Sequence, residues 1–146
     1  MEKRIGSAPN GITYPVWAWH TWEFKHKRPD LRLMSFRVYE PSVLMEVEIS
    51  DDRVLLTDEE KWDFILGNHY LNVAIDENTW EQKEAKYDAL LPDEQEKIKL
   101  ESWQDVFNID PFENDFMSQG KWIQATFWDL KKEDIVKVWP IKVRRK

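Results

Sequence analysis

The chain has 146 residues, and 42% of them are hydrophobic, so we expect one domain over residues 1–146 with its own buried core. The absence of cysteine excludes disulfides, thiolate nucleophiles and cysteine-type zinc sites. A net charge of −7 argues against tight binding to duplex nucleic acid, which needs clustered lysine and arginine. We find no signal peptide and no run of about 18 apolar residues, and we therefore expect a cytoplasmic protein with no membrane partner.

The run YPVWAWHTW at residues 14–22 is rich in the β-branched and aromatic residues that favour strands. Because residues two apart share a face of a strand, Trp17 and Trp19 project to one side. The other side receives Val16, Ala18, His20 and Trp22. Both faces need covering, which predicts a central strand.

Two further strands are predicted before the middle of the chain. Residues 31–39 (LRLMSFRVY) alternate loosely between apolar and polar. Residues 43–49 alternate more clearly, because Glu46 and Glu48 separate apolar side chains. Pro41 lies between the two segments and predicts a hairpin or an adjacent antiparallel pair.

The middle of the chain predicts helices. Thr57 followed by Glu60 has the capping-box pattern of a helix start, and Gly67 is well placed to end that helix. Thr79 with Gln82 repeats the pattern for a second helix that ends near residue 90. Both helices therefore begin, by this prediction, at a threonine.

The segments around these helices are more polar. Residues 93–100 predict a charged helix, and residues 102–107 predict a short amphipathic turn that directs inward Trp103, Val106 and Phe107. Residues 72–78 and 110–120 are expected to be loops.

Two strands are predicted near the end of the chain, at residues 121–130 and 135–143. Pro140 cannot donate to a sheet ladder, so the last strand is expected at an edge. The order of elements predicts an α+β fold: a mostly antiparallel sheet of about five strands, with two to four helices inserted between the first three and the last two strands.

Acidic residues gather at positions 58–60, 93–96 and 113–115. Our first interpretation is that they form solvated helix starts and loops, because acidic groups favour the first turn of a helix. The alternative is an acidic surface that imitates nucleic acid or binds a basic partner.

The run WIQATFWD at residues 122–129 holds the most informative pattern for binding. One face of this strand carries Gln124 and Thr126 between Trp122 and Trp128, which suits recognition of a flat, polar ring. The alternative is that both polar side chains are buried and satisfied by neighbouring backbone. The full set of predicted ligand-binding residues is Trp17, Trp19, Trp62, Tyr70, Trp122, Gln124, Thr126 and Trp128.

Catalytic candidates are few. His20 is a candidate general base and Arg32 a candidate phosphate contact, although a core histidine and an arginine at the rim of a site are the simpler interpretations. The chain has no HExxH, P-loop, GxGxxG or GxSxG motif and no histidine or carboxylate pair at metal spacing. We therefore expect neither a metal nor a cofactor.

Several segments together resemble a bacterial and phage family, the domain of unknown function 3841. The matching pieces are Arg4-Ile5-Gly6, residues 10–19, residues 28–32, residues 46–49, residues 54–58, Trp62, Tyr70-Leu71, Ser102-Trp103 and residues 123–128. Family members usually have a strand and a helix ahead of the arginine-glycine turn, and this chain is expected to lack that segment. The resemblance implies a bacterial cell as the location but no reaction.

Three functions remain open at this point. The first is a non-catalytic protein, such as a phage or mobile-element factor, that binds a nucleotide-like ligand or a host protein and modulates host signalling or defence. The second is a small transferase-like enzyme acting on a nucleotide or NAD-type substrate. The third is a structural subunit whose aromatic patch mediates homo-oligomerisation.

Overall fold

A computed structural model of the chain describes residues 1–28, 30 and 41–141. The chain divides into two compact units. Unit 1 comprises Met1–Ala18, Arg28–Leu55 and Ala125–Lys146, and unit 2 comprises Trp19–Lys27 and Leu56–Gln124. A single domain over residues 1–146 stays a prediction.

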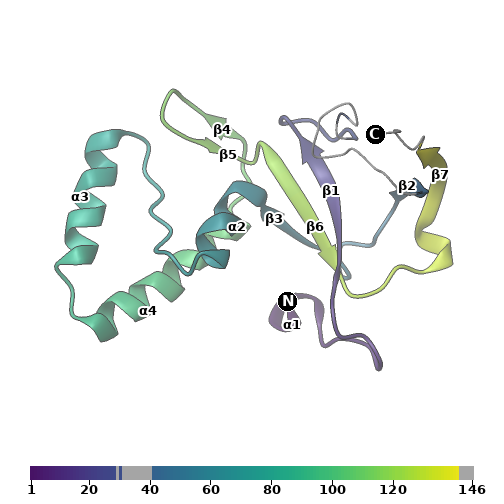
Figure 1. Ribbon diagram of the computed structural model, residues 1–146, viewed down its shortest axis with the longest axis horizontal. Coiled ribbons are helices and arrows are strands. Elements are labelled where there is room, and N and C mark those ends of the chain that lie inside the picture. The colour runs from purple at the N-terminus through teal and green to yellow at the C-terminus, as the bar shows by residue number, and fades with distance from the viewer. Residues whose placement is uncertain (29, 31–40, 142–146) are drawn as a thin grey trace. The chain divides into compact units, whose positions relative to one another are not determined.

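The fold is α+β, as predicted. Its strands are β1 (Val16–Trp22), β2 (Ser42–Val47), β3 (Leu55–Asp58), β4 (Phe112–Glu113), β5 (Ser118–Gln119), β6 (Trp122–Phe127) and β7 (Ile135–Ile141). They form a three-stranded sheet in the order β1-β6-β3 and two antiparallel pairs, β2-β7 and β4-β5 (Figure 1). The strands thus form several small sheets, where the sequence predicted one.

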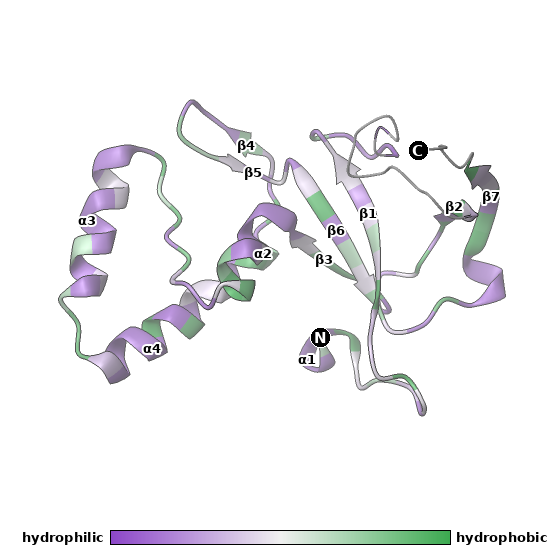
Figure 2. Cartoon of the chain, viewed as in Figure 1, coloured by the Kyte–Doolittle hydropathy of each residue, from purple (hydrophilic) through white to green (hydrophobic). Residues whose placement is uncertain are grey.

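Helices separate the early from the late strands, again as predicted. They are α2 (Glu59–Leu66), α3 (Glu77–Asp88), α4 (Pro92–Ser102) and the 3-10 helix η2 (Trp103–Phe107). Helices α3 and α4 are mostly hydrophilic, as Figure 2 shows. Among the residues described, no helix combines the length and apolar character needed to cross a membrane.

Strand β6, and not β1, is the central strand of the three-stranded sheet within the described chain. Its inward face is apolar and buried, through Ile123, Ala125 and Phe127, as the sequence predicted. By contrast, Trp17 of β1 is 49% exposed. The prediction of a central β1 was wrong because the side chains on the two faces of a strand do not determine whether it has hydrogen-bonded neighbours along both edges.

An aspartate, and not the predicted threonine, caps each of the first two long helices. The cap of α2 lies one residue after the predicted one, and the cap of α3 lies three residues before it. Asp58, and not Thr57, caps α2, since its side chain accepts a hydrogen bond from the Lys61 N–H at 3.3 Å. Asp76 caps α3 and accepts from the Thr79 N–H at 2.7 Å. A carboxylate at the cap also interacts favourably with the helix dipole.

Two small elements were not predicted. Helix α1 (Glu2–Ile5) lies in the segment expected to be only a lead-in, and the β4-β5 hairpin lies in the expected loop 110–120. The final strand pairs only with β2 among the described residues, as expected for a strand that contains Pro140. The predicted strand at 31–39 lies outside the described residues.

Candidate functional site

Three tryptophans of unit 2 form a ring cluster. The Trp19 and Trp22 rings meet edge to face with centroids 5.1 Å apart, and Trp22 lies 6.3 Å from Trp122. Lys121 places its Nζ 5.2 Å from the centroid of the Trp122 ring. Trp122 Nε1 is buried and has no hydrogen-bond partner among the described residues. Trp22 was expected on the opposite face of β1 from Trp19, so the ring contact between them was not foreseen.

Three other predicted ligand-binding residues are bonded within their own unit. Trp62 Nε1 donates to Thr57 Oγ1 at 2.8 Å, and Trp128 Nε1 donates to the Gly6 carbonyl at 2.8 Å. The Tyr70 ring stacks on Tyr87 with centroids 4.3 Å apart. Burial, assisted by the negative charge of Glu84, raises the pKa of Tyr70. Internal contacts therefore use the indole N–H of both tryptophans and one face of the tyrosine ring.

The remaining predicted residues differ in exposure. Trp17 is half exposed, Gln124 is half-buried, and Thr126 is buried. Thr126 Oγ1 has no hydrogen-bond partner among the described residues, so the expectation that neighbouring backbone satisfies this side chain finds no counterpart there. Ligand binding by the predicted tryptophan-rich face stays a prediction.

Of the two catalytic candidates, the structure describes only His20. His20 Nδ1 lies 2.9 Å from Thr21 Oγ1, and its ring stacks on His26 at 4.4 Å. Burial, followed by repulsion from His26, lowers the pKa of His20. Arg32 lies outside the described residues.

Unit 2 contains a cavity of about 440 Å³, which we call the unit 2 cavity. It is lined by Glu60, Lys61 and Phe64 of α2, residues 71–74, Trp80 of α3, and residues 113–118 of the β4-β5 hairpin. None of the eight predicted ligand-binding residues lines it. A volume of this size suits a small organic ligand.

Hydrogen bonds between the lining segments fix the walls of this cavity. Ser118 Oγ donates to Glu60 Oε2 at 2.5 Å and ties the hairpin to α2. Asn114 Nδ2 donates to the Ile75 carbonyl at 2.8 Å and ties the hairpin to the segment after residue 74. The Leu71 N–H donates to Ser102 Oγ at 3.0 Å, which anchors that segment to α4. The site is therefore largely preformed.

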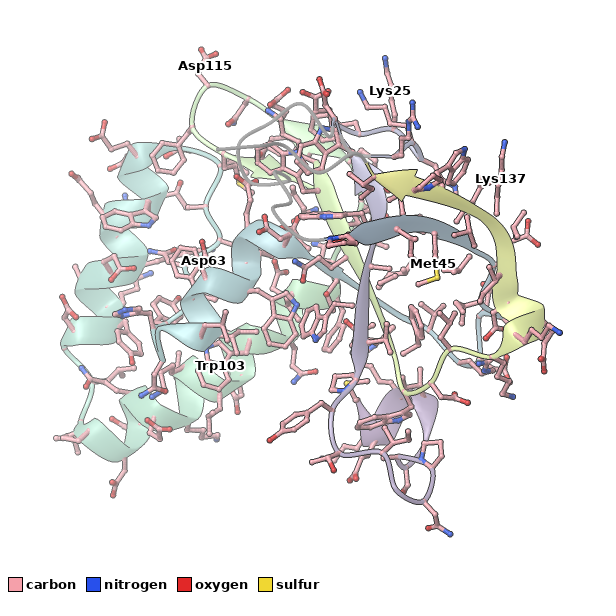
Figure 3. All side chains as sticks on the ribbon, turned by 45° about the vertical axis from the view of Figure 1, so that its right-hand side comes forward. Lys25, Met45, Asp63, Trp103, Asp115 and Lys137 are labelled. Atoms are coloured by element: carbon pink, nitrogen blue, oxygen red, sulfur yellow. The ribbon has the colours of Figure 1, made fainter. Side chains whose placement is uncertain are left out.

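The hairpin itself is held by an internal turn. Asn114 Oδ1 accepts hydrogen bonds from the N–H groups of Phe116 and Met117, at 2.9 and 2.8 Å. This is the local bonding that makes asparagine favourable in turns. Asp115 lies in the connection between the two strands, as Figure 3 shows, and is exposed.

Lys61 is buried beside the cavity, yet its ammonium is fully engaged. Nζ donates to Asp105 Oδ2 at 2.5 Å, to Gln119 Oε1 at 2.8 Å, and to the carbonyls of Asp105 and Asn108 at 3.0 and 3.1 Å. These bonds connect α2 to η2 and β5. Lys61 therefore acts as a structural cation and has no free donor for a ligand.

Asn72 supplies the unusual group of the cavity wall. The residue is only 8% exposed, and its Nδ2 donates to the Trp80 carbonyl at 2.9 Å and to Glu84 Oε1 at 2.8 Å. Its Oδ1 is buried and has no hydrogen-bond partner among the described residues. Turning the amide over would point oxygen at two acceptors, so the orientation is determined by its surroundings. Because Oδ1 has essentially no accessible surface, a ligand in the open volume of the cavity does not reach it.

Sequence reasoning did not identify this site. Asn72 was placed in a loop, and the acidic runs at 58–60 and 113–115 were interpreted first as solvated surface. The sequence offered two signals: Lys61, which directly follows the acidic run at 58–60, and Asn114, which lies between two acidic residues in a predicted loop. Neither pattern indicates which distant segments will meet.

Among the described residues, no three histidine, aspartate or glutamate side chains gather in a way that could hold a metal ion. Comparison with protein families shows that the domain of unknown function (DUF3841) matches residues 1–136 of the chain. The expected resemblance is thereby confirmed. Comparison with curated proteins and with solved structures finds no match.

Proposed function

Since this chain belongs to the DUF3841 family, whose description names no activity, we propose from the geometry of unit 2 that it is a non-catalytic binding protein. Its ligand is a small organic molecule that occupies the unit 2 cavity. The molecule packs against the aromatic side chains of the lining and donates a hydrogen bond to one of its carboxylates.

The observation that supports this proposal most strongly is the cavity itself, about 440 Å³ in volume, whose walls are braced by hydrogen bonds and carry three aromatic rings beside polar groups. Ligand sites in proteins are typically pre-formed, mostly apolar, and provided with a few polar groups that orient the ligand.

The charges of the cavity restrict which nucleotide-like ligands fit it. Its charged lining consists of three carboxylates, those of Glu60, Glu113 and Asp115, and of Lys61, whose ammonium is already bonded. A phosphate placed among these groups would be repelled. A free base or nucleoside therefore fits better than a nucleoside phosphate.

The enzyme alternative has less support. The lining includes no histidine, and its one lysine is held by four acceptors. His20, the expected base, does not line the cavity. A general base must reach the proton that it abstracts. In this lining that role is open only to carboxylates, and Glu60 and Glu113 are already bonded to Ser118 and Lys121.

A cavity-filling substitution tests the proposal. Ala74 is buried in the cavity wall, at 4% exposure, so Ala74→Leu should fill part of the volume. Ala89, the exposed C-cap of α3, provides the matched control Ala89→Leu. Calorimetric titration with a panel of nucleosides, amines and nucleotides should find at least one compound that binds the unchanged chain and the control but binds A74L at least tenfold more weakly. Equal binding to A74L, or no binding by any compound, would contradict the proposal.

A second candidate function is self-association through the β2-β7 pair of unit 1. One face of this ribbon is apolar and exposed, with Val43 at 55%, Met45 at 43%, Val136 at 52% and Val138 at 50%. The pairing register places Met45 opposite Val138 on that face, whereas Glu46 opposite Lys137 belongs to the other. Two copies of the chain could bring these faces together without juxtaposing like charges. A host protein as partner stays an expectation.

A further inference from the structure

The hydrogen-bond donors of the unit 2 cavity are largely used within the protein. Asn72 Nδ2 serves Trp80 and Glu84, and the Ser118 hydroxyl serves Glu60. The N–H groups of Phe116 and Met117 both serve Asn114. A ligand that needs donors would find few in this lining.

Carboxylate acceptors, by contrast, remain available in the lining, at Glu60 and Asp115. Glu60 accepts from the Ser118 hydroxyl, which is a neutral donor and leaves the negative charge of the carboxylate uncompensated by that contact. The ligand must therefore donate hydrogen bonds rather than accept them.

The charge of the lining favours a cation. The Lys61 ammonium forms an ion pair with Asp105 at 2.5 Å. Lys121, which does not line the cavity, forms an ion pair with Glu113 at 2.5 Å. Glu60 interacts with Lys121 only through space, as one of the charges that raise the pKa of Lys121, and Asp115 forms no ion pair among the described residues, so the net charge of the lining stays negative. A positive ligand charge would be attracted and a negative one repelled.

Aromatic side chains complete the wall. Phe64 projects from α2, Trp80 from α3 and Phe116 from the hairpin, and all three line the cavity. The face of an aromatic ring attracts ammonium and guanidinium groups and also packs against short methylene chains. Rings from three separate elements can therefore hold both parts of such a ligand.

We propose that the unit 2 cavity binds an organic cation, an ammonium or guanidinium group on a short apolar body, with its N–H groups directed to the Glu60 carboxylate. This inference rests on the proposed function and specifies the ligand class of the same site. It distinguishes the cation from the neutral nucleoside, which the proposed function also allows.

Calorimetry with three probes tests the charge requirement. Agmatine is the cationic probe, adenosine the neutral probe and adenosine monophosphate the anionic probe. We expect agmatine to bind most tightly, and its dissociation constant to rise about tenfold in Glu60→Gln, which removes one charge but keeps an acceptor for Ser118. Glu59→Gln, next to it on α2 but outside the lining, should change that constant less than about twofold.

A second variant guards against a folding defect in the first. Asp115 is exposed, so Asp115→Asn should leave the unfolding midpoint unchanged and weaken agmatine about twofold to threefold. Binding of adenosine without binding of agmatine would overturn the cation inference and leave the proposed function standing. Equal losses in the Glu59 and Glu60 variants would also overturn it, whereas failure of all three probes would reject the proposed function as well.

Discussion

Lys61 is the residue on which the arrangement of unit 2 depends most. Its ammonium is buried and joins three elements through four hydrogen bonds. Lys61→Met keeps the length of the side chain but leaves Asp105 without its cation. Because Asp105 is about one-third exposed, we expect the free energy of unfolding in urea to fall by about 2–3 kcal/mol, below the usual loss for a fully buried pair.

Lys97 provides the control for that measurement. Its side chain is 75% exposed, and its contact with Glu101 is 3.9 Å long. Lys97→Met should lower the free energy of unfolding by less than about 0.5 kcal/mol. A comparable loss in both variants would mean that the Lys61 bonds contribute no more than a surface ion pair.

Asp134 should make the stability of unit 1 depend on acid pH. Two hydrogen bonds from Arg53, at 2.7 and 2.9 Å, and one from the Lys131 N–H lower the pKa of Asp134 from 3.8 to about 2. A carboxylate with a lowered folded-state pKa stabilises the fold fully above the unfolded pKa, and this contribution is lost as the pH falls from about 4 through 2. Urea midpoints measured across that window should therefore decline.

The substitution Asp134→Asn should flatten this decline, because asparagine does not titrate. Asp129, whose carboxylate lies 3.4 Å from Arg53, gives the control Asp129→Asn, which should keep most of the pH dependence. An identical acid profile in the unchanged chain and in D134N would show that the Asp134 carboxylate does not govern it.

At the scale of elements, the turn between β5 and β6 is the most constrained. Gly120 has φ +68°, its N–H donates to Asp58 Oδ2 at 2.6 Å, and an added Cβ would lie 2.3 Å from the Ile109 carbonyl oxygen. Gly11 has a similar φ of +85° but no atom within 4 Å of such a Cβ. We expect Gly11→Ala to cost about 1 kcal/mol and Gly120→Ala about 3 kcal/mol or more.

Thermal and urea unfolding of the two glycine variants separates backbone strain from steric contact. The backbone term is common to both, so the difference between them measures the contact at Ile109. Equal destabilisation would mean that the turn at Gly120 has room for a methyl group.

The β2-β7 ribbon makes a testable case for self-association. Met45→Glu places a carboxylate at the centre of its exposed apolar face, so two copies would bring like charges together. Sedimentation velocity should then find a smaller species, or a weaker concentration dependence, than for the unchanged chain. Lys137→Gln, on the opposite face, should leave the sedimentation unchanged, and identical profiles for all three proteins would exclude this interface.

Local patterns predicted the kinds of element well. Alternation identified β2 and the inward face of β6, and capping residues identified α2 and α3 to within three residues. The exact starts differed because an aspartate lies near each predicted threonine cap and is an equally good cap. Sheet order was not predictable in this way, since it depends on pairing between distant segments, and aromatic content alone misplaced β1 at the centre.

At the scale of the whole chain, the candidate site was less accessible to sequence reasoning than the fold. The unit 2 cavity combines residues from positions 60 to 118, and much of its wall comes from two segments that were expected to be loops. Tryptophan content drew attention to the sheet instead. Two of those indoles, Trp62 and Trp128, donate to internal acceptors, which their sequence positions could not reveal.

Chemical-shift mapping tests the central claim most directly, because it locates a ligand without assuming its site. The full chain, labelled with ¹⁵N, would be titrated with agmatine and with adenosine. We predict that the amide shifts gather at residues 60–61, 71–74, 80 and 113–118, which line the unit 2 cavity. Shifts gathered instead around Trp19, Trp22 and Trp122, or no shifts with either compound, would contradict the account.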